Sequence, residues 1–244
     1  MNALESSKSN KQTIPVKEYM DTPKTLEALA DAFELLSIAF SFPTIELAEA
    51  LCAGTFQSDL DNCLNELGIS KKVNLKEAKE PQVLLQDLRK EYSRLYLQPG
   101  KFILIYPYES AFLYKLRGKE GFPSLIANPT TIDVERFMKT ANALPENART
   151  EPADSIFTEL RFLSYLYTQV LSITLSDLDD KEKLALQWLT QANSFFQKHI
   201  NNWVPAFLSA TEKSTNDLFY SALSNTSSCI LEKLRHRNHV TEDA

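Results

Sequence analysis

The chain has 244 residues, of which 43% are hydrophobic, 24% are charged and only five are glycine. This composition supports a buried core, and the low glycine content argues against an all-β protein with many tight turns and against glycine-rich phosphate loops. A net charge of −6 disfavours nucleic-acid binding, which needs basic surface, and favours attraction of a basic peptide.

The segments that address proteins to membranes or to secretion are not expected here. The first 21 residues are polar, without the continuous apolar core of a secretory signal. No apolar run approaches the roughly 20 residues of a membrane span. Three scattered cysteines (Cys52, Cys63 and Cys229) do not form a disulfide framework, so we expect a cytoplasmic protein.

The N-terminal half predicts four helices. Residues 1–22 are rich in Ser, Lys and Asn and predict a disordered extension. Thr22-Pro23 predicts the N-cap and first residue of a helix that ends at Pro43. Helices near residues 45–53, 58–67 and 82–97 follow, because apolar residues recur there at helical spacing and Gly or Pro stands after each.

Residues Phe102–Ser110, FILIYPYES, form an apolar and aromatic segment without helical spacing, and Pro107 interrupts it. Surface loops are seldom this apolar, so the segment must pack against something. Two interpretations stay open from the sequence. The segment is either a buried connector or the wall of an apolar groove.

The C-terminal half predicts further helices from Thr130, from Glu151 to Leu175, after Asp177 or Asp179, from Pro205, and over Ser214–Leu234. Residues 235–244 predict a flexible charged tail. The fold class is therefore predicted to be all-α, a single helical domain over residues 23–234 with about nine helices. We expect two loosely separable lobes, joined near residues 118–150.

The stretch Glu151–Leu163, EPADSIFTELRFL, predicts a helix with a carboxylate-marked start. Pro152 suits a first helical turn, and the carboxylates of Glu151 and Asp154 favour the positive end of the helix dipole. One buried face is predicted to hold Ile156, Leu160, Leu163, Tyr167 and Val170. The start of this helix is either a cap or the rim of a recognition site.

The sequence contains no recognisable motif for catalysis or nucleotide binding. The chain lacks a G-x-S-x-G elbow, a Walker loop and a G-x-G-x-x-G loop. His236 and His239 are three apart but lie in the charged tail, and His199 is predicted to be a packed, hydrogen-bonded histidine. We therefore expect no catalytic residue, no metal site and no cofactor, and a protein that is not an enzyme.

Four stretches together resemble the TorD/DmsD/NarJ family of redox-enzyme maturation chaperones. They are LLSIAFSFP (Leu35–Pro43), EYSRLYLQPG with YPYES (Glu91–Gly100 and Tyr106–Ser110), EPADSIFTELRFL (Glu151–Leu163), and FFQKHINNWVPAF with FYSAL (Phe195–Phe207 and Phe219–Leu223). The resemblance runs from about Phe33 to Leu234 in the family's order. It implies an all-helical chaperone for the precursor of a molybdenum-cofactor oxidoreductase, a monomer or a domain-swapped dimer; some members have been linked to guanine nucleotides.

The resemblance also implies a site for a twin-arginine signal peptide. Carboxylates at a rim would bind the arginine pair, and an aromatic groove would take the apolar segment after it. The candidate residues are Asp154, Ser155, Glu151, Glu159 and Glu109 for the polar part, and Tyr106, Tyr108, Phe102 and Phe157 for the apolar part.

One position departs from the family's pattern, because its Asp-His pair is Asp154-Ser155 in this chain. Serine caps a helix or donates a hydrogen bond but carries no charge. Three alternatives therefore stay open beside signal-peptide binding. They are an assembly chaperone for a redox-enzyme subunit that is not exported, an all-α nucleotide-hydrolysing enzyme, and a helical adaptor without chaperone activity.

Overall fold

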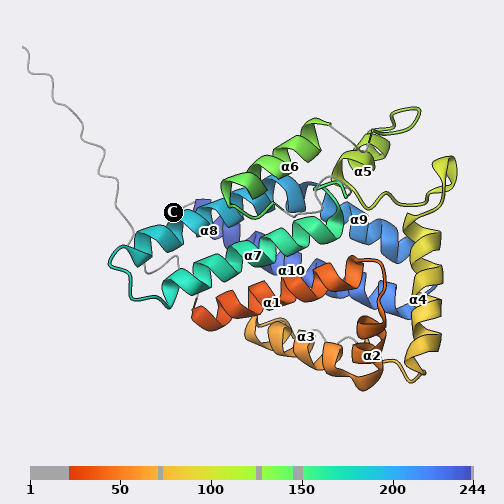
Figure 1. Cartoon of the computed structure of the whole chain (residues 1–244), viewed down its shortest axis with the longest axis horizontal. Coiled ribbons are helices and arrows are strands. Elements are labelled where there is room, and N and C mark those ends of the chain that lie inside the picture. Colours follow the sequence, from red (N-terminus) through yellow and green to blue (C-terminus); the bar gives the residue numbers. More distant parts are fainter. Residues whose placement is uncertain (1–21, 71–73, 125–127, 145–150, 243–244) are drawn as a thin grey trace, which may run out of the picture.

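The computed structural model describes residues 22–70, 74–124, 128–144 and 151–242, and within these ranges the fold is all-α, as predicted. Residues 1–22 are predicted to be disordered, and all of them except Thr22 lie outside the described part. The last two residues of the chain also lie outside it. The elements, in chain order (Figure 1), are α1 (Pro23–Phe40), α2 (Ile45–Ala53), α3 (Thr55–Glu66), α4 (Pro81–Tyr96), the 3-10 turn η2 (Gly100–Phe102), α5 (Glu109–Leu116), α6 (Pro129–Thr140), α7 (Ile156–Thr174), α8 (Lys181–Phe195), the π-helical turn η3 (Phe196–Ile200), α9 (Asn201–Ser214) and α10 (Leu218–Glu242).

The predicted caps and faces of the early helices are confirmed. Thr22 caps α1 by accepting a hydrogen bond from the backbone N–H of Thr25 at 3.2 Å, with Pro23 as the first helical residue. Thr44 caps α2 in the same way. Gly54 ends α2 with a φ of +82°, in the left-handed region that glycine enters without strain.

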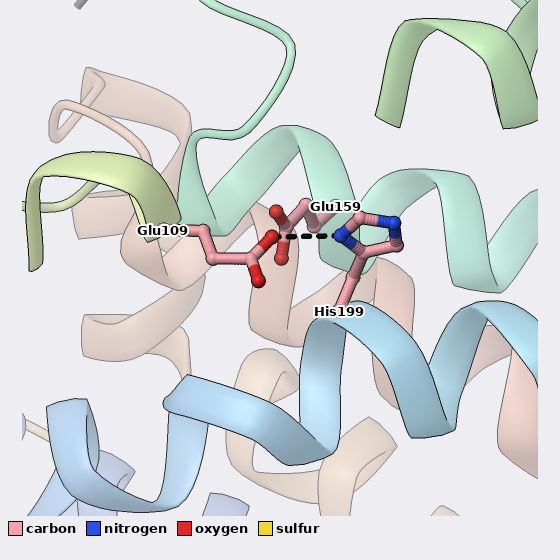
Figure 2. A group of neighbouring side chains, drawn as sticks. All are labelled: Glu109, Glu159 and His199. Atoms are coloured by element: carbon pink, nitrogen blue, oxygen red, sulfur yellow. Dashed lines mark hydrogen bonds and ion pairs between the residues drawn. The ribbon is translucent and has the colours of Figure 1, made fainter. Parts of the chain in front are cut away.

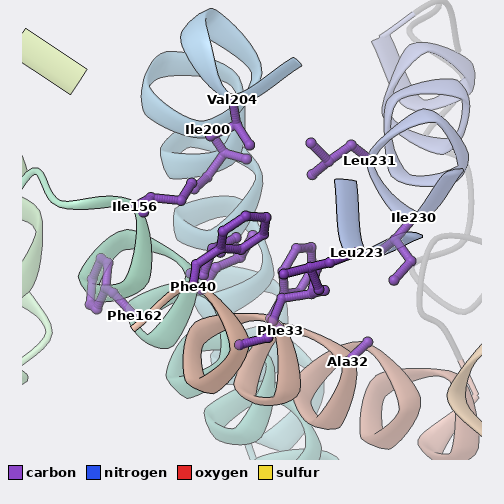
Figure 3. Packing of buried hydrophobic residues seen from close by; sticks show 14 of the residues in the cluster. Ala32, Phe33, Phe40, Ile156, Phe162, Ile200, Val204, Leu223, Ile230 and Leu231 are labelled. Carbon is purple, nitrogen blue, oxygen red and sulfur yellow. The ribbon is translucent and has the colours of Figure 1, made fainter. Parts of the chain in front are cut away.

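Helix α1 packs along α7, and the two predicted apolar stripes meet there. Phe33 of α1 stacks on Tyr167 of α7, with ring centroids 6.0 Å apart. The turn η3 and helices α9 and α10 cover the same core from another side, as Figure 3 shows for Ile200, Val204 and Leu231. In Figure 1, α4 lies at one end of these helices and runs across their direction.

The predicted division into two lobes joined near residues 118–150 is wrong. Buried side chains from both sides of that segment form one core cluster, which extends from Leu26 in α1 to Leu234 in α10. The physical reason is that α1 needs α7 to bury its stripe, so the halves of the chain share one core. Helices α5 and α6 lie on the outside of this core (Figure 1).

Residues Lys181–Ser214 form one continuous helical run, because α8 passes through η3 into α9. The prediction that Pro205 starts a short helix is wrong, since Pro205 lies inside α9. The proline removes one backbone hydrogen bond, but the buried Trp203 and Phe207 on either side hold the helix in the core. Counted as one, this run brings the described part of the chain to the predicted nine helices, besides η2.

Two helix boundaries differ from the prediction in ways that matter for function. Helix α7 begins at Ile156, with Ser155 as its N-cap, so Glu151 and Pro152 lie in the loop before it. Helix α10 continues to Glu242, eight residues past the predicted end, so the backbone of residues 235–242 is helical.

Among the described helices, none on its own is long and apolar enough to cross a membrane. Helices α1 and α2 meet that criterion of length and composition only when they are taken together, and they are bent by 119° at the break between them.

Candidate functional site

The apolar segment between η2 and α5 is held in an extended form by the backbones on both sides. The N–H of Ile105 donates to the carbonyl of Leu95 at the end of α4, at 3.0 Å. The N–H of Ile156, at the start of α7, donates to the carbonyl of Pro107 at 2.9 Å. The segment therefore bridges the end of α4 and the start of α7, where it is partly buried and partly open.

This segment forms the wall of an apolar pocket of about 460 Å³. The pocket lies between the segment, α5 and α9, and it is lined by Gly100, Ile103, Leu104, Ile105, Tyr106, Phe112, Lys115, Leu116 and Ala210. Both interpretations of FILIYPYES are thus partly met. Ile105 and Pro107 are buried as in a connector, whereas Leu104 is 54% exposed on the pocket wall.

Large apolar side chains gather on the surface around this pocket. Phe102 is 65% exposed and Leu116, which lines the pocket, is 61% exposed. Phe122 is 69% exposed, and its ring lies against Gly100, 3.7 Å from where a Cβ atom would stand. Exposed apolar groups around a concave surface are typical of a site that binds an apolar ligand or a peptide. We refer to the pocket and its exposed rim, Phe102, Leu104, Leu116 and Phe122, as the apolar groove.

Asp154 joins the starts of three helices. One oxygen of its buried carboxylate accepts a hydrogen bond from the backbone N–H of Ser110 in α5, at 3.0 Å. The other accepts from the hydroxyl of Thr131 in α6, at 2.8 Å. The next residue, Ser155, caps α7 and is itself buried. The carboxylate of Asp154 therefore interacts with the positive ends of the helix dipoles of α5 and α6. The sequence instead predicts an interaction with the dipole of the helix that follows Asp154, which is α7.

A second group of buried polar side chains lies behind the start of α5. Nδ1 of His199 lies 2.7 Å from Oε2 of Glu109, and Nε2 of the same ring lies 3.1 Å from Oδ2 of Asp133. Glu159 lies beside them (Figure 2), and its Oε2 accepts from the indole N–H of Trp203 at 2.8 Å. His199, Glu109 and Glu159 are each at most 2% exposed. Burial, and then the neighbouring carboxylate of Glu109, raise the pKa of Glu159 well above its usual value.

Of the predicted carboxylates, Glu151 is the one that remains partly open to solvent. It lies beside Tyr108, to which its side chain is hydrogen-bonded, and its Oε1 has no hydrogen-bond partner. Burial raises the pKa of Glu151, and the nearby Asp154 adds to this effect. A partly exposed carboxylate beside an aromatic ring suits a guanidinium group.

The structure thus divides the predicted peptide-binding residues into two groups. Phe102, Tyr106, Tyr108, Phe157 and Glu151 are at least partly exposed, and Tyr106 lines the groove. Asp154, Ser155, Glu109 and Glu159 are buried. The expectation that Asp154, Glu109 and Glu159 lie on an open rim is therefore wrong, because each is enclosed where helices begin or pack. That any of the nine binds a peptide stays a prediction.

Several residues of these sites were not found by sequence reasoning. Asp133 and Asn202 contact the buried polar group from its more exposed side, since Nε2 of His199 lies 3.1 Å from Asp133 and Asn202 donates to Oε1 of Glu109 at 3.2 Å. Helix α5 was not predicted either, because its eight residues follow an aperiodic segment. The contact of His199 with Glu109 joins residues 90 positions apart, and no local pattern encodes it.

Comparison with known proteins gives one clear result. A family model described as "Nitrate reductase delta subunit" matches residues 50–209, about two thirds of the chain. The matched range contains the buried polar group and every residue that the structure places in the apolar groove except Ala210. No individual curated protein matches the sequence.

Proposed function

Because this chain belongs to the nitrate reductase delta subunit family, whose NarJ- and TorD-like members are redox-enzyme maturation chaperones, we propose that it binds the precursor of a molybdenum-cofactor oxidoreductase. The resemblance that the four sequence stretches predict is confirmed at the level of the family. In our proposal the bound part of the precursor is its twin-arginine signal peptide. The chaperone holds that peptide until the cofactor is inserted and the enzyme is ready for export.

The observation that carries this proposal is the apolar groove. A twin-arginine signal has an apolar segment after its arginine pair, and such a segment needs an apolar surface that already exists in the free chaperone. Leu104 and Leu116 both line a pocket of about 460 Å³. Burying a fully exposed leucine contributes about 1.5–3 kcal/mol. These side chains are about half exposed, so we expect each to contribute about 1 kcal/mol.

The arginine pair is assigned to Glu151 rather than to the three enclosed carboxylates. Glu151 is the predicted carboxylate that is still partly exposed, and Tyr108 beside it offers an aromatic face. Asp154 and Glu109 do not contact the peptide in this proposal but support the groove wall from inside the protein. They hold the C-terminal end of the segment that forms the groove wall, since the N–H of Glu109 donates to the carbonyl of Asp154 at 2.8 Å.

Calorimetric titration with a synthetic twin-arginine peptide tests the proposal. Leu104→Asp places a charge on the groove wall, and we expect it to weaken binding at least tenfold. Leu178→Asp is the matched control, because Leu178 is 53% exposed against 54% for Leu104 but lies between α7 and α8, at the other end of the molecule (Figure 1). Equal affinities of the two variants would show that the groove does not bind the peptide.

Ser155 favours a second candidate, a chaperone for a redox-enzyme subunit that is not exported. Its hydroxyl accepts from the N–H of Thr158 and donates to the hydroxyl of the same residue at 2.7 Å, so it is committed to capping α7. A client without a twin-arginine signal needs no charged partner at this position. Replacing both arginines of the peptide by glutamine separates the candidates. Binding of an exported client falls, whereas binding through the apolar segment alone does not change.

A further inference from the structure

The buried polar group has the geometry of ligands around a single centre. One atom each of Glu109, Glu159 and His199 lies within 4.8 Å of the other two. The three residues come from three elements, α5, α7 and η3, and their side chains point toward one another in Figure 2. Metal–ligand bonds of about 2.0–2.1 Å at tetrahedral angles place ligand atoms about 3.3 Å apart. Nδ1 of His199 and Oε2 of Glu109 are 2.7 Å apart, and the other pairs of ligand atoms are within 4.8 Å, so small rotations of the side chains bring all three to one ion, which replaces the hydrogen bond between His199 and Glu109.

Each of these side chains is held from behind by a second residue, which leaves its other polar atom directed at the centre. Nε2 of His199 faces Oδ2 of Asp133 at 3.1 Å, so that Nδ1 is directed inward. Metal-binding histidines nearly always hold a carboxylate or a carbonyl in this way with their second nitrogen. The carboxylates are held similarly. Oε1 of Glu109 accepts from Asn202 at 3.2 Å, and Oε2 of Glu159 accepts from Trp203 at 2.8 Å.

The atom that remains is Oε1 of Glu159, which is buried; within the described residues no N–H or O–H donates to it, and the neighbour of this side chain is the second carboxylate, that of Glu109. Glu159 as a whole is 0% exposed, so solvent does not supply a partner. A buried oxygen left without a partner costs free energy unless a proton or a cation is shared with it. When both are ionised, the carboxylates of Glu109 and Glu159 together carry the charge that one divalent ion neutralises.

We propose that Glu109, Glu159 and His199 bind one divalent first-row transition-metal ion, for which Zn²⁺ is the probe. Two carboxylate oxygens and an imidazole nitrogen form a ligand set that such ions accept, with a fourth position for water. The N–H of Asn202 and that of Trp203 orient the carboxylates, and Asp133 fixes the tautomer of the imidazole ring.

The ion has a path to this centre. A surface pocket of about 350 Å³ between α5, α6 and the η3–α9 region is lined by both Glu109 and His199. Asp133 and Asn202 line the same pocket, so the outer residues stand between solvent and the centre. The three ligand side chains come from α5, α7 and η3. An ion bound to them therefore links these three elements behind the wall of the apolar groove.

The test uses the full chain in a background with His236→Ala and His239→Ala. Two histidines three apart on α10 are an alternative Zn²⁺ site, and this background removes it. After treatment with a chelator and its removal, Zn²⁺ is titrated by calorimetry, and Co²⁺ is titrated by visible absorption. We expect one ion per chain, and a Co²⁺ spectrum with a d–d band typical of four ligands that include nitrogen.

Two variants distinguish this centre from weak surface binding. Glu159→Gln keeps the size of the side chain but removes a ligand, so affinity for Zn²⁺ falls at least tenfold. Asn202→Ala changes an exposed residue behind Glu109, which does not endanger the fold, and it lowers affinity by about tenfold through loss of orientation. The exposed Glu232→Gln on α10 is the control and leaves affinity unchanged. Absence of a stoichiometric ion, or equal affinity in all three variants, overturns the proposal. The measurement involves no peptide, so its failure leaves the peptide-binding proposal standing.

Discussion

Replacing Asp154 by alanine is predicted to act on stability before it acts on peptide binding. The substitution removes the acceptor for the N–H of Ser110 at the start of α5, and loss of a helix cap costs about 1 kcal/mol. It also leaves the hydroxyl of Thr131, in a residue that is 4% exposed, without its acceptor, and a buried unpaired donor costs about 1–3 kcal/mol. We therefore expect a total loss of about 3 kcal/mol.

For a chain of this length, 1 kcal/mol corresponds to a shift in Tm of roughly 2–4 °C, so Asp154→Ala is expected to lower the Tm by about 6–12 °C. Thermal unfolding followed by circular dichroism measures the shift. The exposed Asp177→Ala, in the loop after α7, is the control and should stay within about 1 °C of the unchanged protein. If Asp154→Ala unfolds like this control yet binds the peptide more weakly, the carboxylate contacts the peptide directly and our assignment is refuted.

Two further predictions follow from groups whose pKa is shifted. Hydrogen bonds from Arg94, and then from Thr215, lower the pKa of Glu91 to about 2, although partial burial opposes them. Because the folded-state pKa is below the ordinary value of 4.5, this carboxylate stabilises the fold above pH 4.5 and loses its contribution as the pH falls toward 2. Allowing for solvent screening, Glu91→Gln should remove about 1–2 kcal/mol at pH 7 in urea unfolding, and little at pH 2.5; an equal loss at both values would contradict this. Burial, and then Asp31, raise the pKa of the Cys63 thiol to about 12. Iodoacetamide at pH 8 should therefore modify the partly exposed Cys52 and Cys229 well before Cys63, as peptide mass mapping would show, and early modification of Cys63 would count against the packing of α1 on α3.

The parts of the fold that could be predicted are those that local patterns encode. The apolar stripes of α1 and α7 follow from the spacing of their apolar residues. The start of α1 follows from two adjacent residues, Thr22 as its N-cap and Pro23 as its first helical residue. Pro205 misled the prediction because a proline reads as a helix start, whereas here the buried neighbours carry the helix through it. Tertiary packing overrides local propensity in such places.

The candidate site was predictable in its members but not in its arrangement. The sequence singled out Asp154, Glu109 and Glu159 as carboxylates of interest. It could not show that all three are enclosed, because burial depends on where α5 and α6 dock, and α5 has too few residues to produce a recognisable period. The contacts of His199 with Glu109 and Asp133 likewise depend on helices that lie far apart in the chain.

The groove and the buried polar group meet in one residue. The backbone N–H of Glu109 is bonded to the carbonyl of Asp154, and its side chain is bonded to His199. Glu109 is also the residue at which the apolar segment ends and α5 begins. A change in the group that its carboxylate binds therefore acts on the end of that segment. Leu104 on the groove wall lies five residues before it, and the backbone between them is hydrogen-bonded at Ile105, Pro107 and Tyr108. Occupancy of the buried centre should consequently alter the groove's affinity for a peptide even though no ligand atom of the centre lines the groove. By reciprocity, a bound peptide should change the affinity of the centre for Zn²⁺ by the same factor.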